Sequence, residues 1–434
     1  MMSRKTVPVS STSKSGSAMA QTLPSDTDNH ALETSSIGVP LRKNVQFQLL
    51  WLGGTVSQLG TQLTTYAMPL LILAVTGSFF WAGVIAGVRA TTLILTQMPA
   101  GVWVDRWDRG KVLVWSQTTQ AVAVAAMAAN VFTGLNSIPL FIALAAVDGV
   151  CTAFAGPARS TAIKAVVPPD RLRTAFAQEE ARGHVAWLAG PSLGALLYGF
   201  GRAVPFVADA VTFLVAAVCA WFAKIPARTE QRPRGRVRHD VREAWTWLWR
   251  RRGMRNVVAI FLTLNLLGTA SMIPVVAVVK ERGGPDWLVG LVLTGVGVGG
   301  LLGALISPKV TLRYDRLIVA VLTVFGVSNL AMALPFGAWW PFVPLMVTAI
   351  ATPLLNVSVS AIFTGLVPDD LMGRIDAILT FASRALTPLA PVLGAFLADL
   401  AGGALALLVF GALILVTALV AEFTDLRAPA PQLS

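Results

Sequence analysis

The sequence predicts an all-α integral membrane protein whose twelve transmembrane helices form two pseudo-symmetric six-helix bundles. This prediction rests on a low content of charged residues, on apolar segments of membrane-spanning length and on an internal repeat. Of the 434 residues, 55% are hydrophobic and 13% are charged, whereas an average soluble domain has about 25% charged residues. This composition argues against a soluble multidomain enzyme.

The chain begins with a polar segment, residues 1–43, that is rich in Ser and Thr and lacks the apolar stretch of a secretory signal. We expect a disordered cytoplasmic tail here. Twelve apolar segments follow, and each reaches the roughly 20 residues that a helix needs to cross the hydrocarbon core. They cover, approximately, residues 45–74, 79–104, 111–133, 138–167, 176–200, 204–223, 256–279, 287–307, 316–335, 340–367, 375–398 and 403–423.

An internal repeat divides these spans into two halves, residues 44–223 and 256–424. Shifting the chain by 200 residues aligns AGPSLGALL (189–197) with LAPVLGAFL (389–397) and VVPPDRL with LVPDDLM just before. Nine of the 40 positions between 161 and 200 are identical, and they cluster before and within a span. Because such repeats underlie many transporter folds, we expect a duplicated six-helix unit in which span 5 corresponds to span 11.

The net charge of +12 comes from basic residues that lie mostly on one side of the membrane. With a cytoplasmic N-terminus, 26 of the 34 Lys and Arg fall in tails and inner loops, 3 in outer loops and 5 within spans. The positive-inside rule then places both termini, including the tail 425–434, in the cytoplasm. The basic linker 224–255 contains AWTWLWRRR, which predicts an interfacial helix. We attribute this linker to anionic lipid and not to nucleic acid.

A short charged loop, GVWVDRWDRGK (101–111), joins spans 2 and 3. We expect Gly101 to permit close helix approach. Asp105, Arg106 and Arg109, with Lys111 after them, can form a charge cluster at the membrane surface. The alternative is a simple stop-transfer cluster.

Span 5 contains the segment AGPSLGA, with Gly190, Pro191 and Gly194. Proline removes a backbone hydrogen bond and glycines thin the helix, which predicts a bendable seam against a neighbouring helix. Ordinary helix packing is the alternative, because Gly and Pro are common in membrane helices.

The charged loop resembles the signature G-x-x-x-D-R-x-x-R-[RK] of the major facilitator superfamily, with Gly110 in place of the second basic residue. The span 5 segment is similar to the Gly-Pro motif of exporters in that superfamily. The opening NVQFQLLWLGG, with VDRWDR, PDDLMGR and PFVADAVTF, resembles the drug:proton antiporter group, which includes macrolide efflux proteins and the enterobactin exporter. This resemblance covers residues 44–425. Thr61 and Phe176 depart from it, because an aspartate and an asparagine are common at those two positions.

The resemblance implies the twelve-helix major facilitator fold and a small organic substrate moved by alternating access. It also implies that the proton gradient is the energy source, with no cofactor. In that family the aspartate that corresponds to Asp105 is thought to lie against the N-terminal end of span 11 and hold the inner gate closed. A carboxylate at a helix N-terminus is stabilised by about 0.3–1 kcal/mol, which is consistent with this role.

Two charged residues, Arg89 and Asp148, lie inside spans 2 and 4. Each is ten residues from the outer end of its span, which places both roughly 15 Å deep. Because charges at this depth need a partner, we expect them to pair. Our hypothesis is that protonation of Asp148 breaks the pair and biases the protein between inward-facing and outward-facing states. A static pair that only joins two helices is the alternative.

The other embedded charges have simpler explanations. Glu179, Glu180 and Arg182 fall in the first two predicted turns of span 5, where acidic residues stabilise a helix N-terminus; the two glutamates stay secondary candidates for proton coupling. His184 lies deeper and can titrate near neutral pH, although a packing role is the simpler interpretation. Arg384 in span 11 contacts either an anionic substrate or an acid. We assign a sixth embedded charge, the aspartate of PFVADAVTF, to structure near the outer surface.

Spans 1, 4, 7 and 10 line the central cavity in the fold that the resemblance implies. In this sequence these spans carry, besides Asp148, polar residues amid apolar ones: Gln58, Gln62, Tyr66, Asn265, Asn356 and Ser360. Such a surface suits an amphipathic organic molecule better than a sugar.

The function that we expect is proton-coupled export of an amphipathic drug, antibiotic or other secondary metabolite by a monomer in a bacterial inner membrane. A siderophore exporter, a facilitator or importer of the same fold, and a non-transporting scaffold are the alternatives. GVGVGG (295–300) lies within a span without a preceding strand, so it predicts helix packing and not dinucleotide binding. Two cysteines and three histidines without metal-ligand spacing predict neither a disulfide nor a metal site. We therefore do not expect an enzyme.

Overall fold

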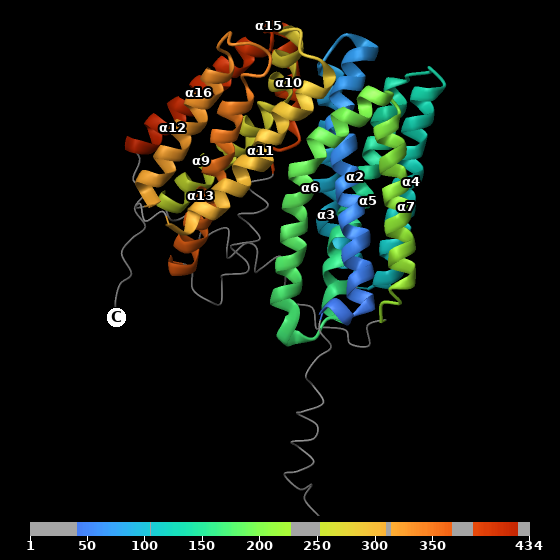
Figure 1. Ribbon diagram of the computed structural model, residues 1–434. Helices are drawn as coiled ribbons and strands as arrows, with labels where there is room; N and C mark the ends of the chain where they lie inside the picture. The colour runs from blue at the N-terminus through green and yellow to red at the C-terminus, as the bar shows by residue number, and fades with distance from the viewer. Residues whose placement is uncertain (1–40, 105, 227–251, 310–313, 367–384, 424–434) are drawn as a thin grey trace, which may run out of the picture. The chain divides into compact units, whose positions relative to one another are not determined.

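The computed structural model describes residues 41–104, 106–226, 252–309, 314–366 and 385–423, and all regular structure in these ranges is helical (Figure 1). The prediction of an all-α protein is confirmed for these residues. The N-terminal tail 1–40, the interfacial helix in the linker and the tail 425–434 lie outside the described residues.

The first six spans appear as six helices close to their predicted limits. Span 5 differs, because its helix begins at Leu172 and not near residue 176. The cause is a short 3-10 helix, Pro169–Arg171, that leads directly into it. The six helices are α2 (Val45–Thr76), α3 (Phe80–Val104), α4 (Arg109–Phe132), α5 (Ile138–Val166), α6 (Leu172–Phe200) and α7 (Val204–Phe222).

The second half contains one feature that the sequence did not predict, because span 7 is two helices that meet at Ser271. Pro274 has no N–H group to donate to the carbonyl of Ala270, so the hydrogen-bond ladder is interrupted there. The helices of this half are α9 (Arg252–Ala270), α10 (Met272–Glu281), α11 (Asp286–Ile306), α12 (Tyr314–Met332), α13 (Phe342–Leu366), α15 (Leu389–Ala401) and α16 (Gly403–Phe423).

Seven helical segments in the described ranges are long and apolar enough to cross a membrane, and three further apolar helices are shorter. The count of twelve spans stays a prediction.

The exposure of the side chains on α4 indicates that an apolar medium surrounds this helix. Gln117 and Gln120 are each 3% exposed, whereas Val122 is 65% and Phe132 71% exposed. Polar groups lie inside and apolar groups outside, as a surrounding bilayer requires.

The two halves repeat one packing scheme. Helix α2 contacts α6 and α7, just as α9 and α10 contact α15 and α16. Helix α3 contacts α5 as α11 contacts α13, and α4 contacts α5 and α7 as α12 contacts α13 and α16. Between the halves, α15 contacts α3 and α6 contacts α11. The α3–α15 pair is the counterpart of the α11–α6 pair, because α3 corresponds to α11 and α6 to α15. The duplication inferred from the sequence repeat is therefore visible in the packing.

A polar contact joins the two halves at the turn between α2 and α3, near residues 77–79. The carboxylate of Asp399, on α15, accepts hydrogen bonds from the backbone N–H groups of Phe79 at 2.8 Å and Phe80 at 2.9 Å and from the hydroxyl of Ser78. A carboxylate from the second half therefore caps the N-terminus of α3 in the first half. The equivalent position in the first half is Gly199, which has no carboxylate to offer.

Candidate functional site

A cavity of about 450 Å³ lies between the two halves. Its wall is mainly apolar and includes Met68 and Phe213 from the first half and Met272 and Val276 from the second. The size falls within the usual range of small-molecule sites, about 300–1,000 Å³. Three charged side chains interrupt this apolar wall, namely Arg89, Asp148 and Asp209.

Arg89 and Asp148 form the pair that their equal depth predicts. The Nε of Arg89 lies 2.5 Å from Oδ2 of Asp148. The second carboxylate oxygen accepts a hydrogen bond of 2.8 Å from Nε2 of Gln120, on α4, which also donates to the hydroxyl of Thr152 at 3.1 Å. The Asp148 side chain, on α5, is only 9% exposed. Its polar contacts therefore come from α3 and α4 and not from solvent.

The sequence places a glycine where this pair needs one. A Cβ on Gly149 would overlap the carbonyl oxygen of Arg89 and the hydroxyl of Thr92. Only a glycine therefore lets α5 approach α3 this closely. The approach brings the Arg89 side chain within reach of Asp148.

Asp209 is a third charged residue of the cavity, and the sequence interpretation missed its position. It is the aspartate of PFVADAVTF that we assigned to structure near the outer surface, yet it is 1% exposed and lines the cavity. Its carboxylate accepts hydrogen bonds from the hydroxyls of Thr64 at 2.6 Å and Thr212 at 3.2 Å. None of the ion pairs between described residues involves it. An acid within an apolar span was a sufficient signal to include it among the site residues.

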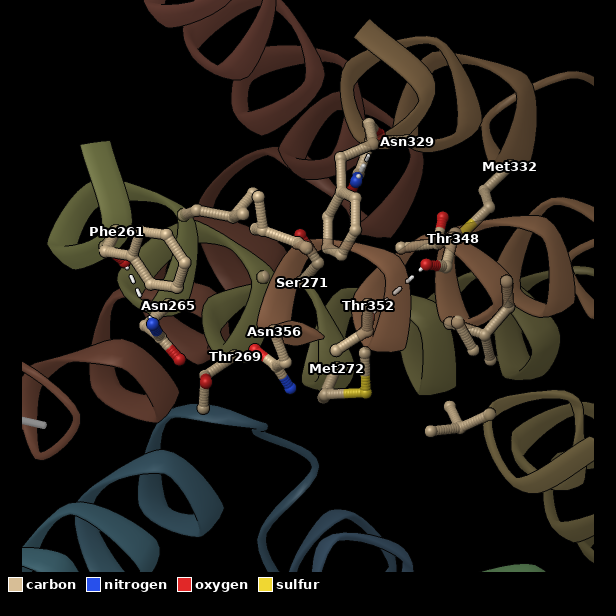
Figure 2. Close-up of a pocket in the computed structure, with 17 residues that line it drawn as sticks. Phe261, Asn265, Thr269, Ser271, Met272, Asn329, Met332, Thr348, Thr352 and Asn356 are labelled. Atoms are coloured by element: carbon tan, nitrogen blue, oxygen red, sulfur yellow. Dashed lines mark hydrogen bonds between the residues drawn. The ribbon is translucent and has the colours of Figure 1, made fainter. Parts of the chain in front are cut away.

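A second cavity of about 200 Å³ lies within the second half (Figure 2). Asn265 and Asn356, both predicted for the substrate cavity, line it together with Asn329, which was not predicted. The two cavities share four lining residues, Gly268, Thr269, Met272 and Val296, so they adjoin one another. No charged residue is among the described residues that line this smaller cavity.

Helix α2 presents one of its three predicted residues to the larger cavity. Tyr66 lines this cavity, as predicted, and so does Thr61. Gln58 and Gln62 are not among the described residues that line these two cavities, so their contact with substrate stays a prediction. Both lie against α6, where a Cβ on Gly190 would lie 2.4 Å from Cβ of Gln62. The side chain of Ser360 and all of residue 384, the predicted arginine contact, lie outside the described residues.

Glu179 does not cap the N-terminus of span 5, so this prediction was also wrong. Because α6 begins at Leu172, Glu179 lies in its third turn, beyond the reach of the terminal N–H groups. Its carboxylate instead pairs with Arg182 at 2.6 Å, and both side chains are largely buried. Glu180 is exposed, and the side chain of His184 lies outside the described residues.

The charged loop is described only in part, because Asp105 lies outside the described residues. Arg106 and Lys111 are exposed, and Nη1 of Arg109 donates to the carbonyl of Thr161 at 3.3 Å. The close helix approach expected at Gly101 is not observed, since a Cβ there meets no described atom within 4 Å. The position of the latch against span 11 stays a prediction.

The Gly-Pro segment of span 5 packs closely on both of its neighbours. A Cβ on Gly194 would lie 3.0 Å from the carbonyl oxygen of Leu63, on α2. On the other side, a Cβ on Gly290 of α11 would lie 2.6 Å from the carbonyl oxygen of Pro191. The helix stays continuous through Pro191. The segment is a close contact between three helices and between the two halves, and whether it bends stays a prediction.

The repeated six-helix packing around a central cavity can now be compared with known proteins. A sequence profile described as the Major Facilitator Superfamily matches residues 50–383. The chain belongs to the Major Facilitator Superfamily. The family resemblance inferred from the motifs is thereby confirmed, and with it the assignment to a family of multi-pass membrane transporters.

Relatives within the superfamily include drug efflux proteins. The multidrug efflux pump Tap of Mycobacterium tuberculosis is 26% identical over 391 residues, which cover 86% of this chain and 90% of the relative. Macrolide efflux protein A of Streptococcus pyogenes is 21% identical over 390 residues, which cover 87% and 95%.

Solved structures of transporters with low sequence identity share this fold. The nucleoside transporter NupG has a TM-score of 0.70 at 13% identity, covering 88% of this chain and 98% of that one. A bacterial homologue of the human lysosomal transporter Spinster has a TM-score of 0.68 at 15% identity, covering 91% and 100%.

Proposed function

We propose that this protein exports an amphipathic organic molecule, such as a drug or antibiotic, by alternating access driven by the proton gradient. It would do so from a bacterial inner membrane with both termini in the cytoplasm. The drug efflux names of its relatives support the substrate class. The observation that carries the proposal is the Arg89–Asp148 pair in the wall of an apolar cavity formed by both halves.

The pair links protonation to packing because it joins α3 to α5. When Asp148 is ionised, the charge attraction and two hydrogen bonds hold these helices and α4 together. A proton on Asp148 removes the ionic attraction and leaves Arg89 with an uncompensated charge. The two protonation states therefore favour different arrangements of the helices around the cavity.

Alternating access requires contacts between the halves that break and re-form. The cap of Asp399 on the N-terminus of α3 is one such contact. In the orientation that the basic residues predict, it lies on the outer side and must separate when the cavity opens outward. The exported molecule would enter from the inner side while this contact is closed.

The cavity favours a drug over a siderophore. Arg89 is the one basic residue among the described residues that line the larger cavity, and Asp148 neutralises it. A multiply anionic siderophore would therefore find no unpaired cation there. The wall favours a largely apolar molecule.

The test is substrate-evoked proton movement in proteoliposomes with an imposed pH gradient, using lipophilic cations, macrolides and siderophores as probes. Wild type is compared with Asp148→Asn, Arg89→Gln and the double variant. We expect each single variant to lose coupled transport. The double variant should recover stability, because no unpaired charge is left, but it should remain uncoupled.

A double variant that recovers proton-coupled transport would show that the pair is only structural. Substrate movement without proton flux in wild type would indicate a facilitator. No movement of any probe would favour the scaffold. Equal accumulation in inverted and right-side-out vesicles would contradict the direction of transport.

A further inference from the structure

The smaller cavity in the second half differs chemically from the charged cavity beside it (Figure 2). Its polar residues are amides and hydroxyls that come from α9, α12, α13 and the junction of α9 with α10. At about 200 Å³ it is too small for a whole drug, because sites for drug-sized molecules are about 300–1,000 Å³. It can hold one substituent of a molecule whose body occupies the adjoining larger cavity.

Two hydroxyl groups in this wall donate their protons to the backbone. Ser271 donates to the carbonyl of Leu267 at 2.8 Å, and Thr348 donates to that of Pro344 at 2.9 Å. A hydroxyl group has one proton and two lone pairs. What these side chains can still offer a ligand is therefore an acceptor.

Two asparagines are oriented in the same way by the backbone. Nδ2 of Asn265 donates to the carbonyl of Phe261, and Nδ2 of Asn329 donates to that of Phe325, each at 2.9 Å. Because a carbonyl oxygen only accepts, each amide must turn its nitrogen toward its own helix. Its oxygen, and the second N–H of its amide group, remain available. Oδ1 of Asn329, whose residue is 2% exposed, has no hydrogen-bond partner among the described residues.

These four side chains thus each offer a ligand an acceptor, and the lining residues Asn356 and Thr269 add an amide and a hydroxyl that can donate as well as accept. The described residues of this wall carry no charge. A ligand group suited to it has O–H or N–H donors, because each such donor would satisfy an acceptor that is otherwise unpaired in a buried site. A carboxylate or phosphate would meet acceptors and no cation. A group without donors would leave the buried acceptors unsatisfied.

We infer that this cavity is a subsite for an uncharged, hydroxyl-bearing substituent of the exported molecule, which selects substrates by hydrogen-bond donors. This inference rests on the proposed function and narrows its substrate class. Exported molecules would combine an apolar body, held in the larger cavity, with a neutral polar group such as a hydroxylated ring.

The experiment uses three probes with wild-type protein in proteoliposomes. Erythromycin carries several hydroxyls, its per-O-methylated derivative has those donors blocked, and tetraphenylphosphonium has no O–H or N–H group. We expect methylation to raise the half-saturating concentration about 3- to 10-fold, the effect of one lost neutral hydrogen bond.

Variants locate this selectivity. In Asn329→Leu and Asn265→Leu the half-saturating concentrations of the two macrolides should differ by less than about 2-fold. Transport of tetraphenylphosphonium should be unchanged. Asn265 is exposed to the cavity, so its variant keeps the test valid if Asn329→Leu does not fold. Thr323→Val is the matched control. Thr323 also donates to its own helix α12, at Val319, but does not line the cavity.

The possible outcomes separate this inference from the proposed function. Equal half-saturating concentrations of the two macrolides in wild type would overturn the inference and leave drug export standing. Transport of tetraphenylphosphonium alone would do the same. A loss of tetraphenylphosphonium transport in both asparagine variants would also overturn it, because the defect would then be general. Failure of wild type to move any probe would overturn both.

Discussion

The two halves of this protein share a packing scheme but differ in the chemistry of the walls they present. The first half contributes Arg89, Asp148 and Asp209 to the larger cavity. The second half contributes no charged residue to either cavity among the described residues, and its polar groups there are amides and hydroxyls. Equivalent helices therefore meet equivalent neighbours while their cavity faces carry different groups.

This difference shows what a duplicated fold retains. Helix contacts depend on small residues at close approaches, and these recur in both halves: Gly149 faces α3, and Gly299 faces Met346 of α13 at the equivalent pair. The cavity faces are free of that constraint. In the proposed mechanism, the first half then carries the charges on which a proton acts, and the second half offers neutral hydrogen bonds to the substrate.

The largest effect should come from breaking the charged pair. Arg89→Gln leaves Asp148 buried without a cation, and we expect the free energy of unfolding to fall by about 3–5 kcal/mol. Denaturant titration in detergent measures this loss. The double variant with Asp148→Asn should recover at least half of this lost free energy of unfolding. If it recovers none, the two charges do not stabilise each other.

A smaller loss is expected from the glycine that lets α3 and α5 approach. Gly149→Ala forces its new methyl group against the backbone of Arg89, and overpacking of this kind costs about 1–3 kcal/mol. Gly156→Ala on the same helix is the control, because a Cβ there meets no described atom within 4 Å. Equal melting temperatures for the two variants would contradict the proposed close approach.

The cap between the halves should have an effect of about 1 kcal/mol. Asp399→Ala removes this cap, so the cavity should open more often on the side of residues 77–79. A cysteine introduced as Thr65→Cys, in protein lacking Cys151 and Cys219, should then react about 5-fold faster with an impermeant maleimide applied from that side. Asp170→Asn is the control, because the Asp170 side chain is 61% exposed and pairs with the neighbouring Arg171, within the same half. An unchanged rate would show that the cap does not hold the halves together.

The smallest effect on stability should come from Asp209. The amide of Asp209→Asn can keep an acceptor for Thr64, and no ion pair of the described residues is lost. We expect a change below about 1 kcal/mol in the free energy of unfolding. A loss as large as that of Arg89→Gln would show that Asp209 carries an essential charge, and the comparison between the two carboxylates would fail.

Much of the fold could be predicted from the sequence because the bilayer sets segment length and charge placement. The pairing of Arg89 with Asp148 followed from their equal depth alone. The break at Pro274 was readable in principle, although a proline in an apolar span does not by itself tell whether the helix is interrupted. The freed carbonyl of Ala270 lies against Gly394 of α15, a contact that only the tertiary structure reveals.

The rotation of each helix about its own axis could not be predicted. Both faces of α2 are apolar with scattered polar groups, so composition did not decide whether Gln62 or Thr61 faces the cavity. The packing of α6, through Gly190 and Gly194, decides it. Asn329 was overlooked for a related reason, because span 9 is not among the spans that the family resemblance assigns to the cavity.

The cap of Asp399 is one-sided, because the equivalent residue in the first half is Gly199. In an energised membrane, a buried polar cavity is a path along which protons could leak. In the proposed mechanism, a single carboxylate that favours closure on one side would keep the empty carrier closed there without any ligand. Binding of the transported molecule would then offset the free energy of breaking this contact in each cycle, and the empty carrier would not dissipate the proton gradient.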